Sequence, residues 1–155
     1  MPLAACIWGF AMAIQNEIDV RLYYDRWGPT ALRYCQLFLG DQVEAEAATQ
    51  QAFLEVFRSA TDLSIDDDQL PADLMKSIVN AATNRCSRFD KNLDTKDFES
   101  CIRLLPCAER AVFLMRNTFG LNAGQVADIT NTTVEAVNQT CLDAMLRMRK
   151  VWLKR

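Results

Sequence analysis

The chain has 155 residues, of which 50% are apolar and 24% charged, a balance typical of a globular protein. It contains no histidine, so the commonest general base, the Ser-His and Cys-His nucleophile pairs and the most frequent metal ligand are all excluded. The five glycines are isolated and form no phosphate-binding loop. We therefore expect neither an enzyme nor a cofactor or metal site.

Six cysteines stand at positions 6, 35, 86, 101, 107 and 141, and no two of them form a CxxC pair. We interpret them as small buried residues of a cytoplasmic protein kept in a reducing environment. No apolar run reaches the roughly 20 residues that cross a bilayer, so no membrane partner is expected.

Charge is unevenly distributed along the chain. Residues 1–70 have a net charge of −7, residues 71–100 are neutral, and residues 101–155 have a net charge of +4. An acidic front and a mildly basic back predict two modules with different partners.

The first helices follow an apolar start. Residues 1–11 lack the basic region of a secretory signal, and Met12 offers a second start, so the first module is counted from residue 12. A helix is predicted over 17–27, with Gly28 and Pro29 as its end. Another is predicted over 30–39, with Gly40 as its stop. Their inward residues are predicted to be Ile18, Leu22, Tyr23, Ala31, Cys35, Phe38 and Leu39.

Two further helices complete the front module. Asp41 and Glu44 have capping-box spacing at the start of a helix that runs to Ser59. An acidic loop follows, and Pro71 begins the next helix. The buried faces of the two helices are predicted to be Ala45, Ala48, Ala52, Phe53, Val56 and Phe57, and Leu74, Ile78, Ala81, Ala82 and Cys86. The charged, weakly periodic residues 91–100 are predicted to be a linker.

The back module resembles a helix-turn-helix. Pro106 suits the first turn of a helix ending at Thr118, and a short helix covers 122–130, with Asn122 and Gln125 at capping spacing. Thr132 and Glu135 have capping-box spacing before a last helix that reaches Lys150. Its core candidates are Val134, Val137, Cys141, Ala144, Leu146 and Met148. The predicted fold is all-α, with two small helical domains at 12–90 and 101–155.

The order of these pieces is similar to that of the bacterial sigma-70 family of RNA polymerase sigma factors, in particular the extracytoplasmic-function (ECF) group, which keeps only regions 2 and 4. Region 2 is resembled by "GDQVEAEAATQQAFLEVFR" and then by "LMKSIVNAATNRCSRF". Region 4 is resembled by "LLPCAERAVFLMRNTFGLNAGQVADITNTTVEAVNQTCLDAMLRMRK". The resemblance covers roughly residues 20–150. It implies a cytoplasmic sigma factor that directs core polymerase to promoters and helps to open them.

The resemblance also implies partners and site residues. Residues that would bind the clamp of the largest polymerase subunit are Asp41, Glu44, Glu46, Gln50 and Arg58. Residues that would read the downstream promoter element as a single strand are Lys76, Asn80, Asn84, Arg85 and Arg88. On the last helix, Thr133, Asn138, Gln139, Thr140 and Arg147 would contact the upstream element in the major groove. An anti-sigma factor is a further candidate partner.

The last helix lacks the charge that DNA normally attracts. Between Thr133 and Met145 there is no Lys or Arg, and positive charge begins only at Arg147, with Arg110 and Arg116 adding a little from the preceding helix. Either the chain relies on polymerase for affinity, or it is a sigma-like protein that has lost DNA reading and binds a protein as a decoy or adaptor. A helix-turn-helix regulator unrelated to polymerase is a third alternative.

Overall fold

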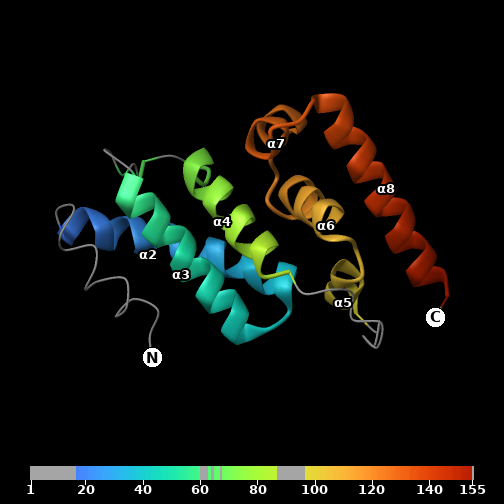
Figure 1. Cartoon of the computed structure of the whole chain (residues 1–155), viewed down its shortest axis with the longest axis horizontal. Coiled ribbons are helices and arrows are strands. Elements are labelled where there is room, and N and C mark those ends of the chain that lie inside the picture. The colour runs from blue at the N-terminus through green and yellow to red at the C-terminus, as the bar shows by residue number, and fades with distance from the viewer. Residues whose placement is uncertain (1–16, 60–62, 64, 67, 87–96, 155) are drawn as a thin grey trace. The chain divides into compact units, whose positions relative to one another are not determined.

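A computed structural model describes residues 17–59, 63, 65, 66, 68–86 and 97–154 (Figure 1). Over these residues the chain is entirely helical, with seven α-helices, one π-helical turn and no strand. The expected all-α class is therefore confirmed for the described part of the chain. None of the described helices combines the length and apolar character needed to cross a lipid bilayer.

The chain divides into two compact units. The first consists of residues 1–36 and 41–85, and the second of residues 37–40 and 86–155. The first unit therefore takes most of helix α2 (Glu17–Leu39), whose last residues belong to the second unit. Of the predicted linker 91–100, residues 91–96 lie outside the described residues, whereas Phe98 already begins a helix.

The prediction that Gly28 and Pro29 end the first helix is wrong, because α2 continues through both residues to Leu39. Proline removes one helical hydrogen bond, but tertiary packing outweighs this local loss. The buried residues recur at helical spacing on both sides of Gly28 and Pro29: Val20, Tyr23, Trp27, Ala31, Tyr34 and Cys35. Leu22 lies off this stripe and is exposed, so its predicted inward position is also wrong.

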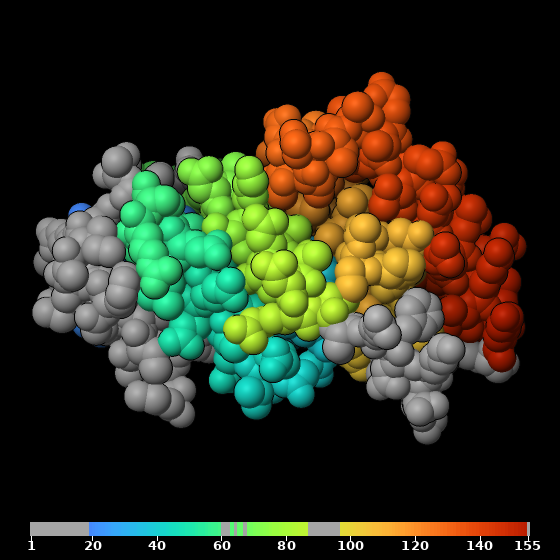
Figure 2. Space-filling view, viewed as in Figure 1, coloured from blue at the N-terminus to red at the C-terminus, as the bar shows by residue number. Residues whose placement is uncertain are grey.

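Helices α3 (Gln42–Ser59) and α4 (Ala72–Asn84) lie side by side in the first unit, as the ribbon and the molecular surface both show (Figures 1 and 2). Every core residue predicted on α3 is buried, as are Leu74, Ile78, Ala81 and Ala82 of α4. The aromatic rings of Tyr23 and Tyr24 from α2 meet that of Phe53, with ring centroids 6.1 and 5.0 Å apart. The core of this unit is therefore aromatic and aliphatic, and α3 contributes a large part of it.

The second unit contains α5 (Phe98–Arg103), α6 (Cys107–Phe113), the π-helical turn η1 (Leu114–Thr118), α7 (Ala123–Thr130) and α8 (Val134–Leu153). The side chain of Asp97 caps α5 by accepting from the backbone amide of Ser100 at 2.7 Å. The predicted helix that ends at Thr118 corresponds to α6 and η1 together, because its second half is widened into a π turn. Gly120 follows in the left-handed conformation.

A short turn separates α7 from α8, and one of the two predicted caps is displaced by a residue. Asn122 and Gln125 form the predicted capping box of α7. The cap of α8 is Thr133, which accepts from the amide of Ala136 at 3.1 Å, and not Thr132 as predicted. Val137, Cys141, Ala144 and Met148 are buried as predicted, whereas Val134 and Leu146 are exposed. Leu146 lies off the stripe that the four buried residues define, whereas Val134 continues its spacing but is the first residue of α8.

Two glycines of the second unit provide a matched test of backbone strain. Gly40 and Gly120 have φ values of +73° and +70°, but only at Gly40 would an added Cβ meet another side chain, that of Arg103. We expect Gly120→Ala to lower the free energy of unfolding by about 1–2 kcal/mol, the strain of an L-residue in this conformation. Gly40→Ala should lose about 1 kcal/mol more, because Arg103 must leave the hydroxyl of Ser100. Urea denaturation of both variants checks this, and equal losses would contradict it.

A buried thiol makes stability depend on alkaline pH. Burial raises the pKa of Cys35 from 9.0 to about 11, although a hydrogen bond with Thr49 works in the opposite direction. The unfolded thiol ionises first, so the stabilisation is complete below pH 9 and is lost as the pH rises towards 11. We expect wild type to lose about 2–3 kcal/mol more than Cys35→Ala over this interval. Urea denaturation at each pH measures it, and parallel profiles would refute the assignment.

Candidate functional site

The predicted polymerase-binding residues lie along the outward half of α3. Asp41, just before the helix, and Glu44 and Arg58 are exposed, while Glu46 and Gln50 are half-buried. The carboxylate of Asp41 accepts from the amide of Glu44 at 2.9 Å, so it caps α3 as predicted. The structure thus keeps all five residues off the buried face, but it commits Asp41 to a structural hydrogen bond.

These residues do not form a single ridge. With about 3.6 residues per turn, Glu46 and Gln50 lie at one edge of the buried face of α3 and Glu44 at the other. Glu46 accepts from Gln42 at 2.7 Å and raises the pKa of Tyr24 on α2, although burial and Asp25 contribute more to that shift. The Glu46 edge therefore borders α2, and the Glu44 edge borders α4.

Glu44 forms an ion pair with Arg85, the residue that ends α4. Nη1 of Arg85 lies 3.0 Å from Oε2 of Glu44, and the two side chains are 32% and 48% exposed. This contact joins a predicted polymerase-binding residue to a predicted DNA-binding residue. Neither charge is fully available to an outside partner while the pair is formed.

The remaining candidates on α4 share one exposed face. Lys76, Asn80 and Asn84 follow one another at four-residue spacing, and all three are exposed. Arg88 lies outside the described residues. In the preceding acidic loop, Asp66 and Asp68 are exposed. The face thus offers two amides and an ammonium group, which suit hydrogen bonding to unpaired bases and contact with phosphate.

Most of the polar groups predicted to read DNA from α8 have partners within the helix. The hydroxyl of Thr140 donates to the carbonyl of Ala136 at 2.8 Å, and Gln139 donates to Asp143 at 2.9 Å. The Thr133 hydroxyl caps the helix, as described above. Asn138 is exposed on the outward face. Base contact by Gln139 would first require it to leave Asp143.

The outward face of α8 is more apolar than a DNA-reading surface needs to be. Leu142, Met145 and Leu146 are 50%, 45% and 46% exposed, directly after Asn138 and Gln139. Arg147 does not add free charge there, since its Nε lies 2.9 Å from the carboxylate of Glu109 on α6. The face therefore runs from polar amides to aliphatic side chains before Arg149 and Lys150 supply positive charge.

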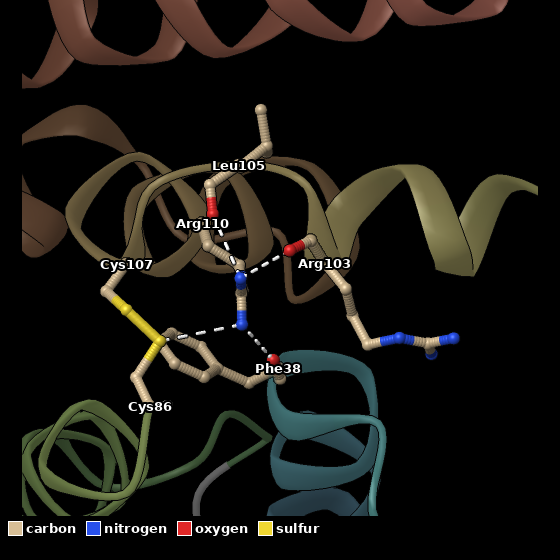
Figure 3. The surroundings of a disulfide bond; sticks show 6 residues. All are labelled: Phe38, Cys86, Arg103, Leu105, Cys107 and Arg110. Carbon is tan, nitrogen blue, oxygen red and sulfur yellow. Dashed lines mark hydrogen bonds between the residues drawn. A yellow bond between two sulfur atoms is a disulfide. The ribbon is translucent and has the colours of Figure 1, made fainter. Parts of the chain in front are cut away.

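Sequence reasoning missed a cluster around Arg110. This residue was expected to add surface charge, but only 6% of it is exposed. Its guanidinium donates to the carbonyl oxygens of Phe38, Arg103 and Leu105 and lies beside a disulfide between Cys86 and Cys107 (Figure 3). The disulfide corrects the interpretation of all six cysteines as buried thiols. The two bridged residues are 21 apart in sequence, so no local motif marks them.

Cys35, Cys101 and Cys141 are free and buried, in agreement with the interpretation made from sequence. In the part of the chain that is described, no three His, Cys, Asp or Glu side chains gather in a way that could hold a metal ion. The sequence matches no protein-family model, and no curated protein is significantly similar to it. The case for a function therefore rests on the surfaces of α3, α4 and α8.

The Glu44–Arg85 pair can be measured directly. Because both side chains are partly solvated, we expect a coupling energy of at most about 1 kcal/mol that decreases with added salt. A double-mutant cycle with Glu44→Gln, Arg85→Gln and the double variant in urea denaturation gives this value. A coupling energy well above that, unchanged by salt, would contradict the expected screening.

Proposed function

We propose that the chain is an ECF-type sigma factor, which binds core RNA polymerase, directs it to promoters and assists their opening. The observation that carries the proposal is the outward half of α3, where carboxylates and amides remain at the surface over an aromatic core. A buried face alone would explain the apolar residues of α3 but not the polar side chains at its two edges. The order of the resembling segments, with a helix-turn-helix at the end, supports the same function.

In this proposal the first unit is the polymerase-binding module. Carboxylates such as Glu46 would be attracted to a basic surface on the clamp, which guides the encounter and sets the orientation. The exposed face of α4, with Lys76, Asn80 and Asn84, would then contact the downstream promoter element after its strands separate. Both sets of residues belong to the same unit, so binding of polymerase would bring α4 to the DNA.

The second unit would place α8 at the upstream element. Its weak positive charge limits what the free protein can achieve, since phosphate contacts supply most of the salt-dependent affinity. Attachment to polymerase makes this contact effectively intramolecular, so little intrinsic affinity is needed. We accordingly expect the isolated protein to bind duplex DNA only in the millimolar range.

One observation favours a second function, that of a sigma-like decoy or adaptor. The exposed Leu142, Met145 and Leu146 occupy the part of α8 that would face the groove, and aliphatic side chains suit a protein surface better than phosphates. In that case the back module would bind a protein, such as an anti-sigma factor. Promoter-dependent transcription by core polymerase distinguishes the two functions, because a decoy yields no transcript.

Binding of core polymerase tests the role of α3. The double variant Glu46→Ala/Gln50→Ala should weaken binding by roughly tenfold, because it removes a carboxylate and an amide from the proposed contact. Asp19→Ala is the control, since it removes an exposed carboxylate from α2 of the same unit. Dissociation constants from pull-down titrations give the comparison. Wild-type affinity in the double variant would favour the third alternative, a helix-turn-helix regulator that is unrelated to polymerase.

Two substitutions on α8 separate DNA reading from protein binding. If α8 reads a base edge, Asn138→Ala should reduce promoter-dependent transcription by roughly tenfold, the loss of one bidentate contact. Leu146→Ser should then have little effect, because Leu146 is exposed and outside the core. Transcription with core polymerase measures both. The reverse order of effects would favour the protein-binding function.

A further inference from the structure

We propose that Cys86 and Cys107 form a reversible thiol–disulfide switch, in which Cys86 is the reacting sulfur and Arg110 the cation that activates it. The bridge links the residue that follows the C-terminal cap of α4 to the first residue of α6. The proposal of the thiol chemistry is independent of the sigma-factor function. Only its consequence for transcription rests on that function.

The first argument is the charge beside Cys86. Nη1 of Arg110 lies 3.6 Å from the sulfur of Cys86 (Figure 3). Backbone carbonyls hold this guanidinium in place, at 2.6 Å for Phe38, 2.6 Å for Arg103 and 3.0 Å for Leu105. A fixed, buried cation at hydrogen-bonding distance favours the thiolate over the thiol.

The second argument is access. Cys86 and Cys107 are both half-buried, whereas Cys35, Cys101 and Cys141 are fully buried. Burial raises the pKa of the Cys35 thiol, the opposite of activation. Among the described cysteines, the two that are only partly buried are therefore the two that are bridged. A bond between partly buried cysteines, with a cation beside one sulfur, has the features of a labile disulfide.

The oxidation that these groups support uses a hydroperoxide. The Cys86 thiolate attacks the peroxide oxygen, the O–O bond breaks, and Cys86 becomes a sulfenic acid as the first water leaves. The Cys107 thiolate then attacks the Cys86 sulfur, forms the S–S bond and expels hydroxide, which takes a proton to give a second water. Two thiols and one hydrogen peroxide thus become one disulfide and two waters.

Reduction reverses the bond with an external thiol. Its thiolate attacks the Cys107 sulfur, and Cys86 leaves as a thiolate that Arg110 stabilises. A second external thiol then releases Cys107 and forms an external disulfide. Arg110 assists both directions, because the Cys86 thiolate is the nucleophile in one and the leaving group in the other.

The switch would change how the residue after α4 is held within the second unit. In the oxidised chain the Cα atoms of Cys86 and Cys107 are 6.5 Å apart, so Cys86 is fixed beside the first residue of α6. Because α4 would contact DNA in the proposed function, we assign the oxidised form, in which its end is fixed, as the less active one.

Single-cysteine variants test the activation without altering Arg110. We expect Cys86 in Cys107→Ser to react with iodoacetamide at pH 7 about tenfold faster than Cys107 in Cys86→Ser. Peptide mass spectrometry identifies the labelled residue, and circular dichroism verifies that both variants fold. Equal rates, or a faster Cys107, would overturn the role of Arg110. Arg110→Lys in the Cys107→Ser background should retain most of the rate, because it keeps the charge.

Reversibility and its consequence are tested on the full chain. Stoichiometric hydrogen peroxide should bridge Cys86 and Cys107 in wild type and in the control Cys141→Ala, and millimolar glutathione should reduce the bridge within minutes. If glutathione does not reduce the bridge, the disulfide has only a structural role, and the proposed switch is overturned. Promoter-dependent transcription should be at least severalfold lower for oxidised than for reduced wild type, and equal for both treatments in Cys86→Ser/Cys107→Ser. Equal transcription by both wild-type forms overturns the regulatory role, whereas no transcription or polymerase binding in either form refutes only the sigma-factor function.

Discussion

The second unit depends on how a buried guanidinium is accommodated. Removing a charged group from water is expensive unless hydrogen bonds replace its hydration, and Arg110 meets this condition through the carbonyls of Phe38, Arg103 and Leu105. These carbonyls come from the end of α2, the end of α5 and the turn before α6. One side chain therefore binds the end of α2, 72 residues earlier, as well as the segment just before α6, and the ring of Phe38 lies 5.2 Å from its charge.

The same arrangement explains the neighbouring backbone. Gly40 ends α2 in the left-handed conformation at a point where a Cβ would collide with Arg103. The chain can thus turn away immediately after the carbonyl of Phe38 has been presented to Arg110. In the first unit the corresponding constraint is apolar, since the rings of Tyr23, Phe53 and Phe57 pack edge to face or at a tilt around α3. The polar side chains of α3 lie outside this aromatic cluster.

Helical periodicity predicted the parts of the structure that depend on local packing. The buried face of α3 and the capping box at Asn122 are examples, because each needs only residues three or four apart. The prediction that Pro29 ends the first helix was wrong because it used a local rule, whereas a continuous stripe of buried side chains keeps α2 helical through Pro29. The burial of Arg110 and its contact with Cys86 depend on residues up to 72 positions apart, which periodicity does not show. For the candidate site, sequence could nominate Glu44 and Arg85 separately but not their ion pair.

The disulfide has a practical consequence for any preparation of this protein. Chains purified in air and chains purified with a reductant would share one sequence yet differ in covalent topology, the first containing a closed ring and the second being linear. Such material would migrate as two species in an electrophoresis gel run without reductant, and an assay on the mixture would average their properties. The oxidation history of a sample is thus as much a part of its chemical identity as its sequence.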